Sequence, residues 1–283
     1  MELHEYPSIA SSPDYEGVSY HVGDPTVKHG VYISNMKMMW HVGGHCKEVL
    51  QNLRSTRKRK VWIDATCINP NDVAEHAQQV GIMGQIFHCA RRVIAYLGDS
   101  GDIQSCEQAR FGRMWVVQEA IHARELVVHC RTKEFPWPWD SSFKGTGWAD
   151  FDNVLRNGGL ANVDIPSLRR WYVSHPLYAR YLPKNKRYMT ATALPSVGIL
   201  PFTELLALML ATRKFACKDP RDKLFAILSL FAGPIPALLA PDYSRPVRGV
   251  YDNIAVFLGT ALPSELYSDA APSRHGSMNT EFA

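Results

Sequence analysis

The sequence predicts an α/β protein with a mainly parallel sheet flanked by helices, followed by a mostly helical C-terminal extension. Between residues 15 and 130, short apolar runs of strand length alternate with segments whose apolar residues recur at helical spacing. Strands joined by helices of about 10–15 residues are typical of right-handed βαβ units and parallel sheets. After residue 131 this alternation stops, and helical spacing returns from about residue 202.

The predicted strands are short and rich in apolar residues. They lie at residues 15–20, in a hairpin at 31–34 and 37–42, and at 61–63, 93–97 and 126–129. The run at 61–63 ends at Asp64, and Gly98 ends the run at 93–97. Because each run is too short for a helix, we expect the central ones to be buried strands.

Three crossover helices are expected between these strands. Cys46, Val49, Leu50 and Leu53 lie at i, i+3, i+4 and i+7, which is one helix face. The second helix begins after Asp72, with Glu75 three residues on, a spacing that resembles a capping box. The third carries one row of side chains facing the same way: Phe111, Trp115, Gln118 and His122. Later helices are predicted at 202–215, 221–231 and 247–258.

The 283 residues are enough for one large domain or two small ones. We expect an α/β domain at residues 1–132 and an extension at 133–262 that is irregular at first, then helical, and packs on that domain. Residues 263–283 are polar and are expected to form a disordered tail.

Charge and apolar content limit the kinds of partner that the sequence indicates. The formal net charge is +4, which is too small to indicate a nucleic-acid protein, and no nucleic-acid partner is expected. The basic residues Arg54 and 57–60 follow a predicted helix, where a solvated helix end is favoured over a nucleic-acid patch or a nuclear signal. No signal peptide is visible, and the uncharged run at 224–241 contains three prolines. We therefore expect no membrane span and a cytoplasmic protein.

The cysteines and common motifs indicate little chemistry. Six cysteines are scattered with no C-x-x-C pair, so reduced thiols are expected and no metal site is predicted. Cys67, in the loop after Asp64, is the one thiol placed near a potential site, although a small buried residue is the favoured interpretation. The G-x-G-x-x-G, P-loop, H-E-x-x-H and G-x-S-x-G motifs are absent.

Acidic residues at strand and helix ends are the more informative feature. Asp64 ends a predicted strand and Asp24 follows the first strand, at the edge where open parallel sheets bind ligands. Gln118 and Glu119 interrupt an otherwise apolar helix, a conflict that functional sites often produce. The alternative is that Glu119 faces solvent or pairs with Arg113 or Arg124.

Several blocks resemble the fungal heterokaryon incompatibility (HET) domain. YEGVSYHVGD, VWIDATCINPNDVAEHAQQVGIMGQIFHCARRVIAYLG and FGRMWVVQEA are similar, in order, to its three blocks. CKDPRDKLFAILSL and PDYSRPVRGVYDNIAVFL resemble the segment that often follows it. The resemblance implies a fungal cytosolic protein of non-self recognition whose activation triggers growth arrest or cell death.

The HET domain is in turn regarded as a remote relative of the TIR domain. This relationship implies a TIR-like, flavodoxin-like fold and raises the hypothesis of an NAD glycohydrolase with NAD as substrate and no resident cofactor. The catalytic glutamate of such enzymes would correspond to Glu119, on the helix that contains Trp115. The residues expected near the NAD site are Ser19, Tyr20, Asp24, Asp64 and Trp115, of which Trp115 is interpreted mainly as a packing residue.

Other functions remain open beside this one. A signalling or scaffold module that acts by homotypic assembly would have the same fold, and protein partners or self-association are expected. A degenerate, inactive paralogue is a third alternative. It is motivated by Val22 and Pro70, where the family usually has Trp and Gln, and by a short connection between Gly98 and Phe111 that could also reflect a gene-model error.

Overall fold

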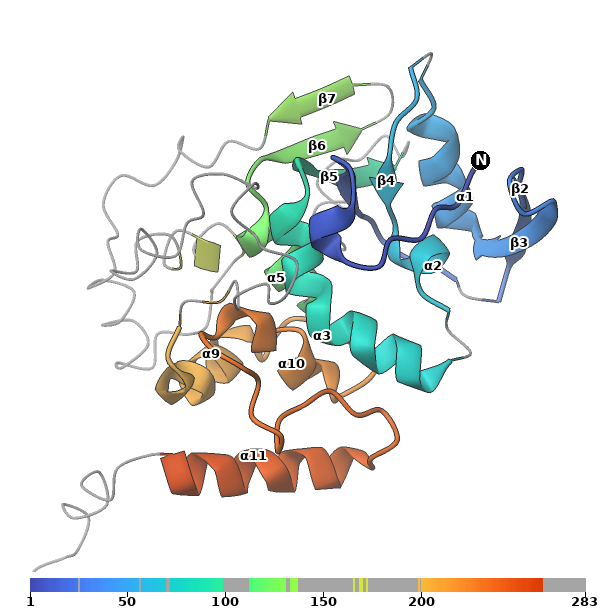
Figure 1. The fold of residues 1–283 in the computed structure, drawn as a ribbon. Coiled ribbons are helices and arrows are strands. Elements are labelled where there is room, and N and C mark those ends of the chain that lie inside the picture. The colour runs from blue at the N-terminus through green and yellow to red at the C-terminus, as the bar shows by residue number, and fades with distance from the viewer. Residues whose placement is uncertain are drawn as a thin grey trace, which may run out of the picture.

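A five-stranded sheet forms the centre of the protein (Figure 1). The computed structural model describes residues 1–24, 26–55, 57–69, 72–98, 112–130, 133–136 and 200–261, together with Ile165, Leu168, Arg169, Tyr172 and Gly198. The sheet has the order β4-β1-β5-β6-β7. Its strands are β1 (Glu16–Ser19), β4 (Val61–Trp62), β5 (Arg92–Gly98), β6 (Leu126–Cys130) and β7 (Lys133–Pro136).

Four of these strands are parallel and β7 is antiparallel to β6. The helices α1 (Gly44–Asn52), α3 (Val73–Cys89) and α5 (Met114–His122) each precede the next parallel strand. Each helix therefore runs from the carboxyl edge of the sheet back to its amino edge. The predicted mainly parallel α/β fold is thus confirmed.

The two faces of the sheet have separate cores. Val93, Ala95 and Leu97 of β5 pack with side chains of α3 and α5 in the larger cluster. The alternate residues Ile94 and Tyr96 pack with α1 in the smaller one. Because neighbouring side chains of a strand point to opposite faces, this one strand divides the two layers.

The first layer depends on a close approach of α3 to β1. A Cβ atom on Gly17 would lie 3.0 Å from the Phe87 ring. Phe87 is 1% exposed and also meets Trp62 edge to face. A glycine in β1 therefore allows the aromatic ring of α3 to lie directly against the backbone of the strand.

The start of α3 follows the sequence prediction in part. The Asp72 carboxylate accepts hydrogen bonds from the backbone N–H groups of Ala74 and Glu75. The Glu75 carboxylate, however, accepts from the backbone of Asn69 at 3.3 Å and so does not complete a capping box. Asp72 alone supplies the side-chain cap that satisfies the first turn.

A separate hairpin lies beside α1. Strand β2 (Lys28–Ile33) pairs antiparallel with β3 (Met38–Gly43), as the sequence predicts. Lys37, in the connecting turn, has a φ of 53°. Tyr32, Met36, Met38 and Met39 are exposed, so the hairpin presents apolar side chains to solvent.

The C-terminal region is helical and packs on the face that carries α3 and α5. It contains η4 (Phe202–Glu204), α9 (Leu205–Thr212), α10 (Asp222–Phe225), η5 (Leu228–Leu230) and α11 (Val247–Ala261). The helix predicted at 221–231 is divided into α10 and η5, because hydrogen bonds from Ile227 and Leu230 close tighter i→i+3 turns. Among the described residues, no helix is both long enough and apolar enough to cross a bilayer.

Three short elements were not expected from the sequence, the first being the 3₁₀ helix η1 (Ile9–Ser11). The stretch after β4 forms the helix α2 (Asp64–Cys67) rather than an open loop. Strand β7 extends the sheet just beyond residue 132, where the α/β domain was predicted to end. Phe111, most of the 98–111 connection, Pro70 and the predicted tail at 263–283 lie outside the described residues.

Candidate active site

Ser19 and Glu119 meet at the carboxyl edge of the sheet. Ser19 is the last residue of β1, and its hydroxyl donates a hydrogen bond to the Glu119 carboxylate on α5. Both side chains are buried, at 2% and 6% exposed respectively. The alternative in which Glu119 faces solvent is therefore wrong. The strand positions the donor and the helix positions the acceptor, so the sheet-to-helix packing fixes the pair.

Tyr20 continues the edge immediately after Ser19. Its side chain is 4% exposed, and its hydroxyl lies beside the Asp64 carboxylate and the Cys46 thiol. Burial raises the pKa of Tyr20 far above its ordinary value, and the nearby Asp64 carboxylate and Cys46 thiol raise it further. Tyr20 is therefore a neutral hydroxyl group that can still donate or accept a hydrogen bond.

Asp64 lies at the first turn of α2, directly after β4. Its carboxylate accepts from the backbone N–H of Ala65 at 2.6 Å. Burial raises the pKa of Asp64, while the Ala65 hydrogen bond and the positive charge of Arg113 partly oppose that rise. The structure thus brings Ser19, Tyr20, Asp64 and Glu119 to one edge of the sheet.

Arg113, which the sequence predicts only as an alternative ion-pair partner of Glu119, also lies at this edge. It occupies the N-cap position of α5, and its guanidinium donates a hydrogen bond to the backbone carbonyl of Tyr20. Its charge contributes to lowering the pKa of His21, after the larger effect of burial. His45 lies beside His21, with ring centroids 5.7 Å apart. A fixed cation therefore lies near the Asp64 carboxylate, and the His21 ring lies near that cation.

Trp115 and Asp24 form hydrogen bonds with residues other than Ser19, Tyr20, Asp64 and Glu119. Trp115 Nε1 donates to Asp222 at 3.0 Å, and the Tyr243 hydroxyl donates to the same carboxylate at 2.7 Å. Trp115 thus ties α5 to α10. Asp24 is exposed and accepts from the backbone and hydroxyl of Thr26 at 2.8 and 2.7 Å, which lowers its pKa. These contacts give both residues local structural roles.

A second polar cluster lies between α3, α5 and η5. The Ser229 hydroxyl donates to Gln118 Oε1 at 2.8 Å, and His122 Nε2 lies 3.0 Å from the same hydroxyl. Because the Ser229 proton is used toward Gln118, the neutral His122 ring donates from Nε2. Burial lowers the pKa of His122 well below its ordinary value. The polar residue Gln118 therefore serves packing between helices, next to but separate from Glu119.

The thiols are poorly suited to nucleophilic chemistry. Cys46 and Cys67 are reduced, and burial raises the pKa of Cys46 to about 12 and also raises that of Cys67. Raised thiol pKa values keep the sulfur protonated and unreactive. Within the described part of the chain, no group of three or more His, Cys, Asp or Glu side chains has the arrangement of a metal site.

Comparisons with known proteins give matches that each cover about a third of the chain. Residues 15–111 match the family described as "Heterokaryon incompatibility protein (HET)". "Heterokaryon incompatibility protein 6, OR allele" of Neurospora crassa is 29% identical over 106 residues, covering 33% of this chain and 16% of that protein. No solved structure matches the chain. The family match includes Ser19, Tyr20 and Asp64 and ends before Arg113 and Glu119.

Proposed function

We propose, from the HET domain that residues 15–111 carry, that this chain acts in fungal non-self recognition and that it does so as an NAD glycohydrolase. The name of the Neurospora crassa relative supports the biological role. Growth arrest or cell death would follow from loss of NAD. The matched stretch covers 16% of that relative, so the activity proposed concerns the present chain only.

The hydrogen bond between Ser19 and Glu119 is the observation that carries the chemical proposal. In NAD hydrolysis the bond between ribose C1′ and the pyridinium nitrogen breaks, and its electron pair stays on nitrogen. Nicotinamide leaves as a neutral molecule, while positive charge develops on the ribose, as in glycoside hydrolysis. Water then adds to C1′ and releases a proton. The leaving group is already cationic in the substrate, so one positioned carboxylate is sufficient.

Four residues at the edge have a role in this scheme. Glu119 stabilises the ribose cation, and Ser19 orients its carboxylate through their hydrogen bond. Arg113 supplies a fixed positive charge beside the edge, suited to the pyrophosphate of the dinucleotide. The Tyr20 hydroxyl, buried beside Asp64, offers one hydrogen bond to a ribose or amide group.

The test compares Glu119→Gln with the parent chain. We expect induced expression of the parent in yeast to lower NAD and stop growth, and the variant to lose at least about a hundredfold in NAD cleavage when purified. Glu125→Gln is the matched control, because Glu125 is exposed three residues beyond the end of the same helix. Equal NAD cleavage by the parent and the correctly folded Glu119→Gln chain would refute the catalytic assignment.

A second candidate function is signalling by self-assembly, which the β2–β3 hairpin favours. Tyr32 and Met39 face each other across the two strands and are 53% and 51% exposed. Exposed apolar side chains on a two-stranded sheet are suited to an interface between copies. We expect Met39→Lys to reduce the assembled fraction in light scattering. Growth arrest with NAD intact in the parent and in Glu119→Gln would favour this function over hydrolysis.

A further inference from the structure

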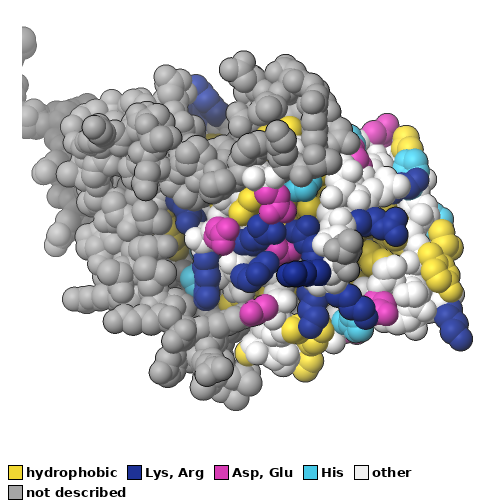
Figure 2. All heavy atoms as spheres, turned by 90° about the horizontal axis from the view of Figure 1, so that it is seen from above, with side chains coloured by type: hydrophobic (Ala, Val, Ile, Leu, Met, Phe, Trp, Pro, Cys, Tyr) yellow, Lys and Arg dark blue, Asp and Glu magenta, His cyan; other side chains and the backbone are white. Residues whose placement is uncertain are grey.

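The amino edge of the sheet, opposite the candidate active site, collects positive charge. Helices α1, α3 and α5 all end there, and each C-cap is followed at once by an arginine: Arg54, Arg91 and Arg124. The loop before β4 adds four more cations at 57–60. We name these residues, together with Arg92 at the start of β5, the amino-edge basic face. Figure 2 shows Lys and Arg side chains gathered together on the surface seen from above.

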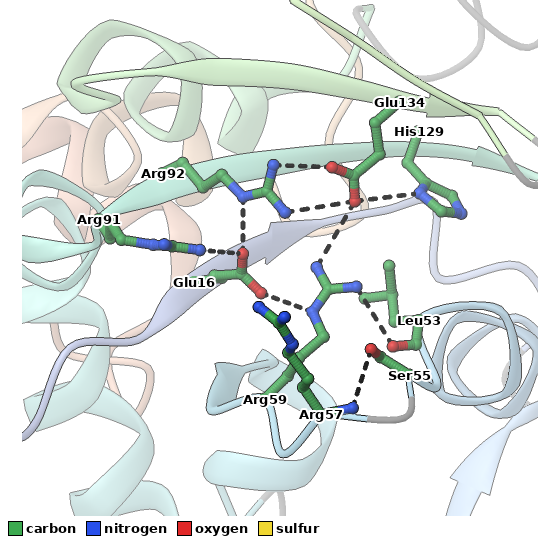
Figure 3. A network of polar contacts seen from close by, with 9 residues as sticks. All are labelled: Glu16, Leu53, Ser55, Arg57, Arg59, Arg91, Arg92, His129 and Glu134. Atoms are coloured by element: carbon green, nitrogen blue, oxygen red, sulfur yellow. Dashed lines mark hydrogen bonds and ion pairs between the residues drawn. The ribbon is translucent and has the colours of Figure 1, made fainter.

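A buried carboxylate organises the centre of this face (Figure 3). Glu16 is 4% exposed and accepts hydrogen bonds from three guanidinium groups: Arg59 at 2.8 Å, Arg91 at 3.0 Å and Arg92 at 2.6 Å. Burial alone would raise the pKa of Glu16, but the hydrogen bonds from Arg59 and Arg92 outweigh it and lower that pKa. Glu16 is therefore ionised, and it holds three arginines in fixed positions.

A second carboxylate is used in the same network. Arg92 donates to both oxygens of Glu134, at 2.7 and 3.3 Å. Arg59 Nη2 lies 3.6 Å from Glu134 and is buried without a hydrogen-bond acceptor among the described residues. Both glutamates therefore already accept hydrogen bonds from arginines of the network. Arg59 Nη2 is the one buried guanidinium donor of this network that has no hydrogen-bond acceptor among the described residues.

The face contains more cations than its carboxylates neutralise. The described ion pairs of this face involve two carboxylates, Glu16 and Glu134, whereas the face contains eight Lys and Arg side chains. Each helix C-terminus contributes only about half a negative charge. Arg57, Lys58 and Lys60 are exposed, and none of them forms a side-chain hydrogen bond or ion pair with a described residue.

The surroundings of these cations indicate the kind of partner. None of the large apolar side chains exposed in the described part of the chain belongs to 54–60, 91–92 or 124–125. Protein interfaces usually contain such apolar anchors at their centre, and single-stranded nucleic acid requires aromatic stacking. A compact face in which cations outnumber carboxylates, without exposed large apolar side chains, fits a plane of negative charge, to which each Lys or Arg near the surface adds attraction.

We propose that the amino-edge basic face binds the anionic headgroups of a phospholipid membrane surface. Phosphate and carboxylate oxygens of the headgroups accept hydrogen bonds from Arg57, Lys58 and Lys60. These contacts resemble those that the Glu16 carboxylate makes with the arginines of the same face. The opposite edge, with Ser19 and Glu119, then faces away from the lipid. The chain would lie on the surface without entering the bilayer.

The experiment is co-sedimentation of the full chain with phosphatidylcholine vesicles, with and without phosphatidylserine. We expect binding only with phosphatidylserine, weakening as salt rises. The triple variant Arg57→Gln, Lys58→Gln, Lys60→Gln should bind at least about tenfold more weakly. The control Lys28→Gln, Lys37→Gln, Lys218→Gln removes the same charge from other exposed positions and should retain binding.

Three results would overturn the proposal. Two concern phosphatidylserine vesicles: no binding to them at all, or binding that the loop triple variant leaves unchanged. The third is tighter binding to duplex DNA than to the anionic vesicles at equal salt, lost in the same triple variant, which would make the face a nucleic-acid surface. Both triple variants should unfold at the same temperature as the parent, because the substituted side chains are exposed. A difference in binding then reflects the surface charge and not a loss of the fold.

Discussion

Ser229 packs directly against Gly84 of α3, in the space that the side chain of a larger residue would occupy. A Cβ atom on Gly84 would lie 2.3 Å from Cβ of Ser229 and 3.0 Å from Nε2 of His122. The same Ser229 hydroxyl bonds to Gln118 on α5. One glycine therefore allows η5 to touch both crossover helices, and the polar contacts of Ser229 join the C-terminal region to the α/β core.

This contact predicts opposite effects for two glycines of one helix. Gly84→Ala should destabilise the protein by about 1–3 kcal/mol, because the added methyl group overlaps Ser229. Gly81→Ala should stabilise it by up to about 1 kcal/mol, because no atom lies within 4 Å of the added Cβ and alanine favours the helix. Urea unfolding measures both. If the two substitutions have the same sign, the described packing of η5 on α3 is incorrect.

Acid should destabilise the protein through His88. Burial, with a smaller contribution from the charge of Arg124, lowers the pKa of His88 to about 4. His122, whose pKa is lowered in the same direction, lies 6.2 Å away between ring centroids. The unfolded chain then binds protons more tightly than the native state, so stability is complete above about pH 6.5 and falls as the pH drops toward 4.

Replacement of His88 isolates its part of this pH dependence. His88→Gln is neutral at every pH and should remove up to about 3 kcal/mol of the loss between pH 7 and pH 4. The free energy of unfolding at these two pH values, in the parent and in the variant, is the measurement. An identical loss in both chains would show that His88 does not carry the effect.

The sequence predicted the sheet layers well because burial on two faces leaves a clear pattern. The runs at 61–63, 93–97 and 126–129 became β4, β5 and β6 with small shifts at their ends. Strand β7 escaped prediction because Phe135-Pro136 reads as a break, whereas an antiparallel edge strand tolerates proline. Helix α2 is a single turn, too short for periodicity to reveal.

The candidate site was predictable only in part, because some of its contacts leave no local pattern in the sequence. Ser19, Tyr20, Asp64 and Glu119 were selected by position at strand and helix ends or by resemblance, and the structure places them at one edge. The sequence does not predict the contact of Arg113, because its guanidinium bonds to the backbone carbonyl of Tyr20 and such a contact leaves no pattern in the sequence. Contacts between residues far apart in the chain cannot be obtained from local spacing.

Glu16 should be far more important for stability than another glutamate at the same edge. Glu16→Gln leaves Arg59, Arg91 and Arg92 close together without the negative charge that holds them, and breaking such a buried ion pair costs about 3–5 kcal/mol. Glu125→Gln, at an exposed site, should change stability by less than about 0.5 kcal/mol. Chemical denaturation compares them; equal small effects would show that the arginines do not depend on Glu16.

Ser19 allows the structural and chemical roles of the candidate site to be separated. Ser19→Ala removes the hydrogen bond to Glu119 and should lower stability by about 1–3 kcal/mol, because both groups are buried. If Glu119 acts on NAD, the same change should also reduce the rate of NAD cleavage by the purified chain, whereas Gly84→Ala should reduce stability alone. Parallel measurement of unfolding and NAD cleavage distinguishes the cases: a loss of stability in Ser19→Ala with a fully retained rate would limit the Ser19–Glu119 bond to a structural role.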